Sequence, residues 1–165
     1  MSTTEVWLDQ IEDYRFRLHF SAPGSNSSNE ASTPERMQAW IVDEPAPLGS
    51  GQGPSPGQLL LAAVANCLSD SLLFALRKFK QKAEPIRTVA SQTTGRNPEG
   101  RLRVTGIRVT LHLGAAAAEL EHLERILGQF ELYCTVSQSV GQAIPIAVAV
   151  FDAQGQQLSG TLDRE

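Results

Sequence analysis

The segment GPSPGQLLLAAVANCLSDSL, residues 53–72, predicts the start of a long buried helix. Ser55 can cap it, Pro56 suits the first helical position because its missing N–H would have no partner there, and Gln58 completes a capping box. The run LLLAAVANCL is apolar on nearly every face, which is typical of a helix inside a core. No Pro or Gly interrupts the chain from Gln58 to Glu84, so we expect about 27 helical residues, roughly 40 Å in length.

Strands are predicted on both sides of this helix. Period-two alternation or short apolar runs mark five of them, at residues 14–20, 37–42, 86–94, 101–113 and 144–151. In the strand at 101–113, the alternation of apolar and polar residues shifts by one position at Gly106, as a β-bulge requires. Two further helices are expected, at residues 120–130 and 134–142. Since strands and helices do not alternate strictly, the predicted class is α+β, in one domain over residues 1–165.

Composition excludes several classes of protein. The chain has 165 residues, a formal net charge of −4 and only two cysteines. These values argue against a disulfide-stapled secreted scaffold and against general binding of nucleic acid or anionic membranes. The N-terminus has no apolar signal segment, and the apolar run at residues 59–65 is shorter than the roughly 20 residues of a membrane span. We therefore expect a cytoplasmic protein without a membrane partner.

Three apparent motifs fail on physical grounds. GPSPG at residues 53–57 has the spacing of a hydrolase elbow, but Pro56 lacks the N–H that an oxyanion hole needs. The glycine-rich loop at residues 49–53 has neither dinucleotide-binding spacing nor a following Lys-Ser or Lys-Thr. The histidines lack metal-site spacing, so no metal site is expected from them; they are His19, His112 and His122.

Residues 77–108 hold nine of the fourteen Lys and Arg. They could form an anion- or nucleic-acid-binding patch, or they could be the solvated faces of a helix end and two strands. Apart from Phe79, the segment has no aromatic residues that could stack on bases. This favours the interpretation as solvated faces.

The two cysteines are the remaining candidates. Cys67 lies about three turns into the predicted helix, where a cysteine is commonly a small core residue. Polar residues interrupt the helix beside it, and buried polar groups need partners; they are Asn66, Ser69, Asp70 and Ser71. Cys134 lies at the start of a predicted helix, where free N–H groups favour a thiolate. The sequence therefore allows either a redox pair or two structural thiols.

The two cysteine segments together resemble those of the OsmC/Ohr family, the osmotically inducible and organic hydroperoxide resistance proteins. Residues 53–72 match the family pattern G-x-(S/N)-P, an apolar run and the first cysteine. ELYCTVSQSV, residues 131–140, is similar to the second-cysteine segment, which usually reads C-P-V-S. The resemblance implies antiparallel sheets around the long buried helix, in a swapped, intertwined homodimer.

For function, the resemblance implies a cysteine-based hydroperoxide reductase active in oxidative-stress defence, without a metal or organic cofactor. Cys67 would attack a small organic hydroperoxide and become a sulfenic acid, and Cys134 would convert it to a disulfide. An external dithiol, a lipoylated protein in some members, would reduce that disulfide. An N-terminal arginine would stabilise the thiolate; Arg15 is favoured, with Arg17 on the same strand face as the alternative.

The sequence departs from the family pattern in two places. Gly57 stands where the family has a glutamate that pairs with the arginine, ten positions before the first cysteine. Thr135 replaces the proline that usually follows the second cysteine. Another carboxylate could hold the arginine, the candidates being Asp43, Glu44 and Asp70.

Two other functions remain open. A non-catalytic dimer of the same fold could bind an apolar small molecule in its interface cleft, and an unperturbed buried Cys67 thiol would favour that function. An anion- or nucleic-acid-binding module would rest on residues 77–108 alone.

Overall fold

The computed structural model describes residues 6–20 and 39–160. By its internal contacts the chain forms two compact units, residues 1–59 and 60–165. The long helix α1 (Pro56–Lys78) begins in the first unit and continues into the second. The expected α+β class is confirmed, because the strands and helices fall into separate runs along the chain. The single domain stays a prediction.

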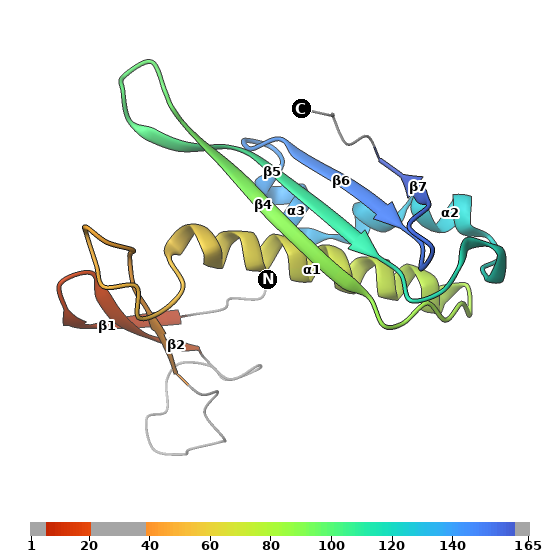
Figure 1. Cartoon of the computed structure of the whole chain (residues 1–165), viewed down its shortest axis with the longest axis horizontal. Helices are drawn as coiled ribbons and strands as arrows, with labels where there is room; N and C mark the ends of the chain where they lie inside the picture. The colour runs from red at the N-terminus through yellow and green to blue at the C-terminus, as the bar shows by residue number, and fades with distance from the viewer. Residues whose placement is uncertain (1–5, 21–38, 161–165) are drawn as a thin grey trace, which may run out of the picture. The chain divides into compact units, whose positions relative to one another are not determined.

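The first unit contains a three-stranded antiparallel sheet in the order β1-β2-β3 (Figure 1). Its strands are β1 (Val6–Glu12), β2 (Arg15–Phe20) and β3 (Trp40–Val42). β2 confirms the first predicted strand. β3 confirms the second over residues 40–42; residues 37 and 38 of that prediction lie outside the described residues. The sequence did not predict β1, because its apolar residues Val6, Leu8 and Ile11 are all exposed and show no buried alternation.

The loop between β3 and α1 is organised by Asp43, which is almost fully buried. Its Oδ2 accepts hydrogen bonds from the Ser50 N–H (3.1 Å), the Ser50 hydroxyl (2.8 Å) and the Gln52 N–H (3.0 Å). These donors, the Gln52 N–H foremost, hold the pKa of Asp43 below its usual range. A side chain at Gly53 would overlap the Ile41 carbonyl, so the loop needs glycine for close backbone packing rather than for phosphate.

The predicted start of α1 is confirmed. The Gln58 N–H donates to the Ser55 hydroxyl (3.3 Å), and the Gln58 side-chain oxygen accepts from the Ser55 N–H (2.9 Å). This reciprocal pair is a capping box, with Pro56 as the first helical residue.

The second unit contains a four-stranded sheet in the order β4-β5-β6-β7. Its strands are β4 (Arg87–Arg96), β5 (Leu102–His112), β6 (Ile146–Phe151) and the unpredicted three-residue β7 (Gln157–Ser159). Thr93 pairs with Gly106 and Thr94 with Val104, so Thr105 is the extra residue of the predicted bulge. The β4–β5 hairpin extends beyond β6, which pairs only with residues 107–112 (Figure 1).

The expectation of purely antiparallel sheets is wrong for β5 and β6, which are parallel. Residues 113–145 connect the end of β5 to the start of β6 through a long crossover. Such a connection carries the chain back to the end of the sheet where β5 begins, so β6 runs in the same direction as β5.

One face of α1 forms the core of the second unit. Val64, Leu68 and Leu72 are fully buried and belong to one cluster with Val109 and Leu111 of β5. By length and composition alone α1 could cross a bilayer. A core helix passes the same test, and α1 packs one face into the core cluster of the second unit. The opposite face is exposed within the single chain, so the expectation of burial on nearly every face of the run 59–68 is wrong for Ala62, Ala63 and Asn66. The exposed face continues through Asp70 and Phe74.

α1 ends at Lys78, six residues before the predicted end at Glu84. Lys80 adopts the left-handed conformation with a φ of 58°. The Lys80 N–H donates to the Arg77 carbonyl (2.9 Å) and the Gln81 N–H to the Leu76 carbonyl (2.9 Å). These two bonds form a Schellman motif, a helix end that usually has glycine where this chain has Lys80.

The predicted helix at 120–130 is wrong in extent. The chain forms instead the short elements η1 (Ala117–Glu119), α2 (Leu123–Leu127) and η2 (Phe130–Tyr133). His122, with a φ of 58°, prevents a continuous helix. The predicted apolar stripe nevertheless faces inward, with Ile126 and Phe130 fully buried. The next predicted helix is confirmed as α3 (Thr135–Val140).

Lys80→Gly is expected to raise the free energy of unfolding by about 0.5–1 kcal/mol, because glycine adopts the left-handed conformation without steric cost. Lys82→Gly removes the same charge two residues later, outside any helix or strand, and serves as the matched control. Urea denaturation measures both. A loss of stability in Lys80→Gly as large as that in Lys82→Gly would contradict the assigned helix end.

Asp43→Asn is expected to lower the melting temperature at pH 7. Because the folded pKa of Asp43 lies below its unfolded value, its contribution is present above about pH 3.9 and is lost as the pH falls through the folded pKa. Wild type and variant should therefore converge at acidic pH in thermal melts followed by circular dichroism. Glu44→Gln is the control, and a pH-independent difference for Asp43→Asn would refute the role of its charge.

Candidate functional site

Cys67 lies on α1 at the edge of its buried face. The residues on either side of it along the helix differ in exposure, since Asn66 is exposed and Leu68 is fully buried. Cys67 itself is half-buried and is packed against the core cluster of the second unit. A thiol in this position is within reach of small molecules without being fully solvated.

Cys134 is fully buried at the junction between η2 and α3. It is the N-cap residue of α3, and its Sγ accepts a hydrogen bond from the Ser137 N–H at 3.3 Å. Ser137 is also buried, and its hydroxyl donates to the Cys134 carbonyl at 3.4 Å. The predicted position of Cys134 at the start of a helix is therefore confirmed.

The structure brings the two cysteines together although 66 residues separate them in sequence. The Cys67 thiol lies close enough to the Cys134 thiol and to the Val136 N–H for both groups to act on its pKa. Both sulfurs thus lie near backbone N–H groups of the first turn of α3. Two neighbouring thiols can form a disulfide after oxidation, which two isolated structural thiols cannot do.

Burial raises the pKa of the Cys67 thiol, and the hydrogen bond with Cys134 raises it further. The negative charge of Asp70, one helical turn away, acts in the same direction. The Val136 N–H opposes these effects but does not overcome them. Within the second unit, therefore, Cys67 is held as a neutral thiol at neutral pH, and a thiolate there needs a positive charge from another group.

Three of the four polar residues beside Cys67 have hydrogen-bond partners: Asn66, Ser69 and Asp70. The Ser69 hydroxyl donates to the Ala65 carbonyl at 2.8 Å and shares a hydrogen bond of 2.6 Å with the Thr88 hydroxyl of β4. The Asn66 side-chain amide donates to the Asp70 carboxylate at 3.1 Å. Thr88 is the polar partner that the sequence required but could not identify, because it comes from a strand 19 residues further along the chain.

Arg15 and Arg17 both lie on β2 in the first unit. Arg15 Nη2 is 2.9 Å from Glu12 Oε2, while Arg17 is exposed and pairs in register with Asp9 of β1. The carboxylate that holds Arg15 is thus Glu12, which was not among the three candidates. The sequence missed it because β1, and so the hairpin that brings Glu12 to Arg15, was not predicted.

Arg15 also lines a pocket of about 560 Å³ within the first unit, together with Asp43 and the loop that Asp43 organises. Asp43 is committed to that loop by its three hydrogen bonds. The pocket therefore presents one guanidinium beside an ordered, glycine-containing loop.

The two departures from the family pattern have simple structural settings. Gly57 is the second residue of α1, where it contributes no side chain. Thr135 is the first residue of α3 and follows the N-cap Cys134. Replacing the usual proline by threonine thus leaves the helix start intact.

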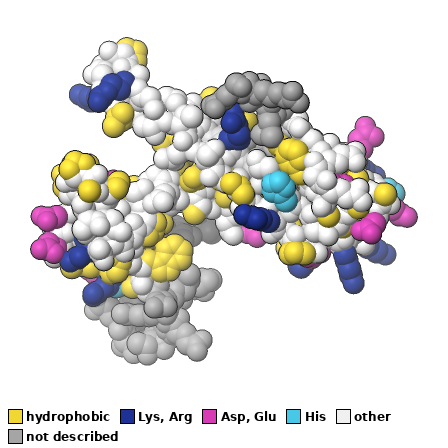
Figure 2. All heavy atoms as spheres, viewed as in Figure 1, with side chains coloured by type: hydrophobic (Ala, Val, Ile, Leu, Met, Phe, Trp, Pro, Cys, Tyr) yellow, Lys and Arg dark blue, Asp and Glu magenta, His cyan; other side chains and the backbone are white. Residues whose placement is uncertain are grey.

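Other sequence candidates do not form a site. Among residues 6–20 and 39–160, no group of three or more His, Cys, Asp or Glu side chains could hold a metal ion. Lys and Arg side chains appear at several separate places rather than in one continuous patch on the face that Figure 2 displays. In the segment 77–108, Arg77 pairs with Glu84 at 3.2 Å and Lys78 donates to the Tyr133 hydroxyl at 3.0 Å. These contacts fit the solvated-face interpretation.

Comparison with solved structures shows the fold. An OsmC-like protein of unknown function from Vibrio cholerae is 15% identical, with a TM-score of 0.70 over 92% of this chain and 100% of that one. An organic hydroperoxide resistance protein OsmC from Legionella pneumophila is 14% identical, with a TM-score of 0.67 over 91% and 97% of the two chains. The organic hydroperoxide resistance protein OhrB of Bacillus subtilis is 12% identical, with a TM-score of 0.64 over 90% and 98%.

Sequence comparison gives the family. No curated protein matches the chain significantly. The family described as OsmC-like protein matches residues 49–149, which include both cysteines and the whole of α1. This match spans more than half of the chain and agrees with the fold of the solved structures, so the chain belongs to the OsmC-like protein family.

Proposed function

We propose that this protein reduces organic hydroperoxides through a two-cysteine cycle. The observation that carries the proposal is the proximity of the Cys67 and Cys134 thiols, with Cys67 half-buried beside an apolar core. Two structural relatives, from Legionella pneumophila and Bacillus subtilis, are organic hydroperoxide resistance proteins, which supports this substrate class.

The electrons of the proposed cycle come from the two thiols and an external dithiol. The Cys67 thiolate attacks the terminal oxygen of ROOH, the O–O bond breaks, and the alkoxide takes a proton to leave as the alcohol. The Cys67 sulfenic acid then reacts with the Cys134 thiol, forming the S–S bond and releasing water. A dithiol reduces this disulfide by two exchange steps and is itself oxidised to a disulfide. A lipoylated protein is our proposed dithiol.

Arg15 is the proposed source of the positive charge that Cys67 needs. A guanidinium within about 4–6 Å of a thiol favours its thiolate form. Arg15 is partly buried and held in one orientation by Glu12, whereas Arg17 is exposed. We propose that the chain acts in the cytoplasm as a swapped homodimer, in which the N-terminal strands supply this arginine to the cysteine pair.

A second candidate function is a non-catalytic dimer that binds an apolar small molecule. The raised pKa of Cys67 favours it, because a thiol that stays protonated at neutral pH is a poor nucleophile. The reactivity of Cys67 therefore distinguishes the two functions.

Treatment with one equivalent of cumene hydroperoxide is expected to consume both thiols of the wild type and to lower its mass by two hydrogens. Cys67→Ser should leave Cys134 unoxidised, and Cys134→Ser should stop at the sulfenic acid or oxidise further, because no resolving thiol remains. Intact mass spectrometry under non-reducing conditions, with thiols counted by alkylation, measures each outcome. Survival of both wild-type thiols would refute the reductase and favour the binding function.

Arg15→Ala is expected to slow oxidation of Cys67 at pH 7 by about tenfold or more. Because the arginine would lower the pKa of Cys67, its loss should move the midpoint of the rate–pH profile to higher pH, and the two rates should converge where the thiol is fully ionised. Arg17→Ala is the matched control on the same strand, with dimer content checked by size-exclusion chromatography. If Arg17→Ala slowed the oxidation of Cys67 and Arg15→Ala did not, the stabilisation of the thiolate would be reassigned to Arg17.

A further inference from the structure

Tyr133, the last residue of η2, directly precedes Cys134 and contacts the helix that carries Cys67. Its ring packs edge-to-face on the ring of Phe74 of α1, with the centroids 5.3 Å apart and an interplanar angle of 76°. The ammonium group of Lys78, in the last turn of α1, lies 5.3 Å from the centre of the Tyr133 ring. One side chain therefore links α1 to the end of η2, next to the second cysteine.

The Tyr133 hydroxyl uses both of its hydrogen-bonding roles. It accepts from Lys78 Nζ at 3.0 Å and donates to Gln129 Oε1 at 3.0 Å. A hydrogen bond from an ammonium group is stronger than one between neutral groups. Phenylalanine at this position would keep the ring contacts and lose both hydrogen bonds.

The two anchors of Tyr133 lie on the same side of α1 as Cys67. Phe74 and Lys78 follow Cys67 by 7 and 11 residues, which is close to two and three whole helical turns. Phe74 is therefore roughly 10 Å from Cys67 along the helix axis. Contacts at this end of the helix face fix the part of the chain that must also place Cys134 near Cys67.

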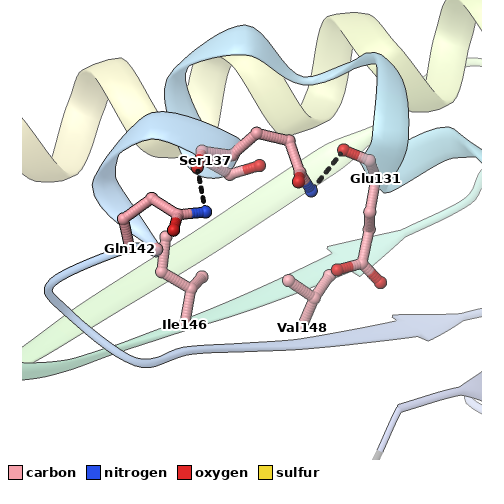
Figure 3. Close-up of a pocket in the computed structure, with 7 residues that line it drawn as sticks. Glu131, Ser137, Gln142, Ile146 and Val148 are labelled. Carbon is pink, nitrogen blue, oxygen red and sulfur yellow. Dashed lines mark hydrogen bonds between the residues drawn. The ribbon is translucent and has the colours of Figure 1, made fainter.

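The segment around Cys134 is held together by its own contacts. Gln138 Nε2 of α3 donates to the Glu131 carbonyl of η2 at 3.2 Å, so this bond spans Cys134 in the sequence (Figure 3). Phe130, the first residue of η2, is fully buried in the core. Because η2 and α3 are joined in this way, the contacts of Tyr133 with α1 also position the Cys134 sulfur.

We propose that Tyr133 is a positioning residue for the disulfide between Cys67 and Cys134. By anchoring the η2–α3 segment on α1, it holds one thiol close to the other and raises their effective concentration. This inference rests on the proposed function in one respect, that these two cysteines form a disulfide. It does not depend on which oxidant forms it.

The test is the equilibrium of the full chain with glutathione at pH 7. One oxidised glutathione converts the two protein thiols to the disulfide and is reduced to two glutathione thiols. Acid quenching, alkylation and mass spectrometry give the equilibrium constant, which has the units of an effective concentration. Tyr133→Phe should lower this constant about three- to tenfold, because its hydrogen bonds are lost. Leu132→Ala, the control, removes the preceding side chain of η2, which is 70% exposed, and should leave the constant unchanged.

This equilibrium separates positioning from a merely structural role. A residue that only stabilises the fold contributes equally to the reduced and the oxidised forms, so its loss does not change the constant. Urea denaturation of both forms of Tyr133→Phe should therefore show a larger loss of stability in the oxidised form.

A second variant tests whether the anchor acts as a unit. Lys78→Met keeps an unbranched side chain and removes the donor to the Tyr133 hydroxyl. It should lower the glutathione constant as Tyr133→Phe does, and the double variant should lower it no further than the stronger single variant.

Three results would overturn the positioning role: a wild-type constant in Tyr133→Phe, additive effects in the double variant, or no disulfide in the wild type with glutathione. The hydroperoxide assay is decided separately. If glutathione shows the effect of Tyr133→Phe but cumene hydroperoxide leaves both thiols intact, the positioning role stands and the reductase is refuted.

Discussion

The packing of α1 against the sheet of the second unit is the interaction on which the rest of that unit depends. Val64, Leu68 and Leu72 are fully buried against a cluster that includes Val109 and Leu111. Truncating one such leucine to alanine commonly costs about 2–5 kcal/mol, a large part of the roughly 5–15 kcal/mol that stabilises a domain. The same packing fixes the rotation of α1 about its axis. Cys67 therefore has only one orientation in the core, and that orientation faces Cys134.

This arrangement has an electrostatic consequence. The burial that brings the two sulfurs together also disfavours a negative charge on Cys67, and the nearby Asp70 adds to the effect. The N–H groups at the start of α3 compensate only in part. A reductase built on this pair therefore depends on a cation from outside the helix, whereas a binding protein does not.

The sequence was most informative where structure is local. The capping box of Ser55 and Gln58 and the bulge beside Gly106 follow from residues a few positions apart, and both are confirmed. Prediction from the sequence failed where tertiary contacts override the local preference for helix or strand. Lys80 ends α1 without the glycine that marks most such ends, and the stripe at 120–130 is buried without forming one helix. β1 was missed because an exposed edge strand has no buried alternation to detect.

The sequence alone determined the family, the α+β class, the start of α1 and the identity of the two cysteines, because these depend on residue type and short-range spacing. Only the tertiary structure showed that the Cys67 and Cys134 thiols lie close together, that Glu12 holds Arg15, and that β5 and β6 are parallel. Glu12 contacts Arg15 across the turn of the β1–β2 hairpin. The sequence did not predict this hairpin, because β1 has no recognisable strand pattern. The other contacts join residues tens of positions apart. Such pairings are set by how apolar faces pack together, which local sequence does not encode.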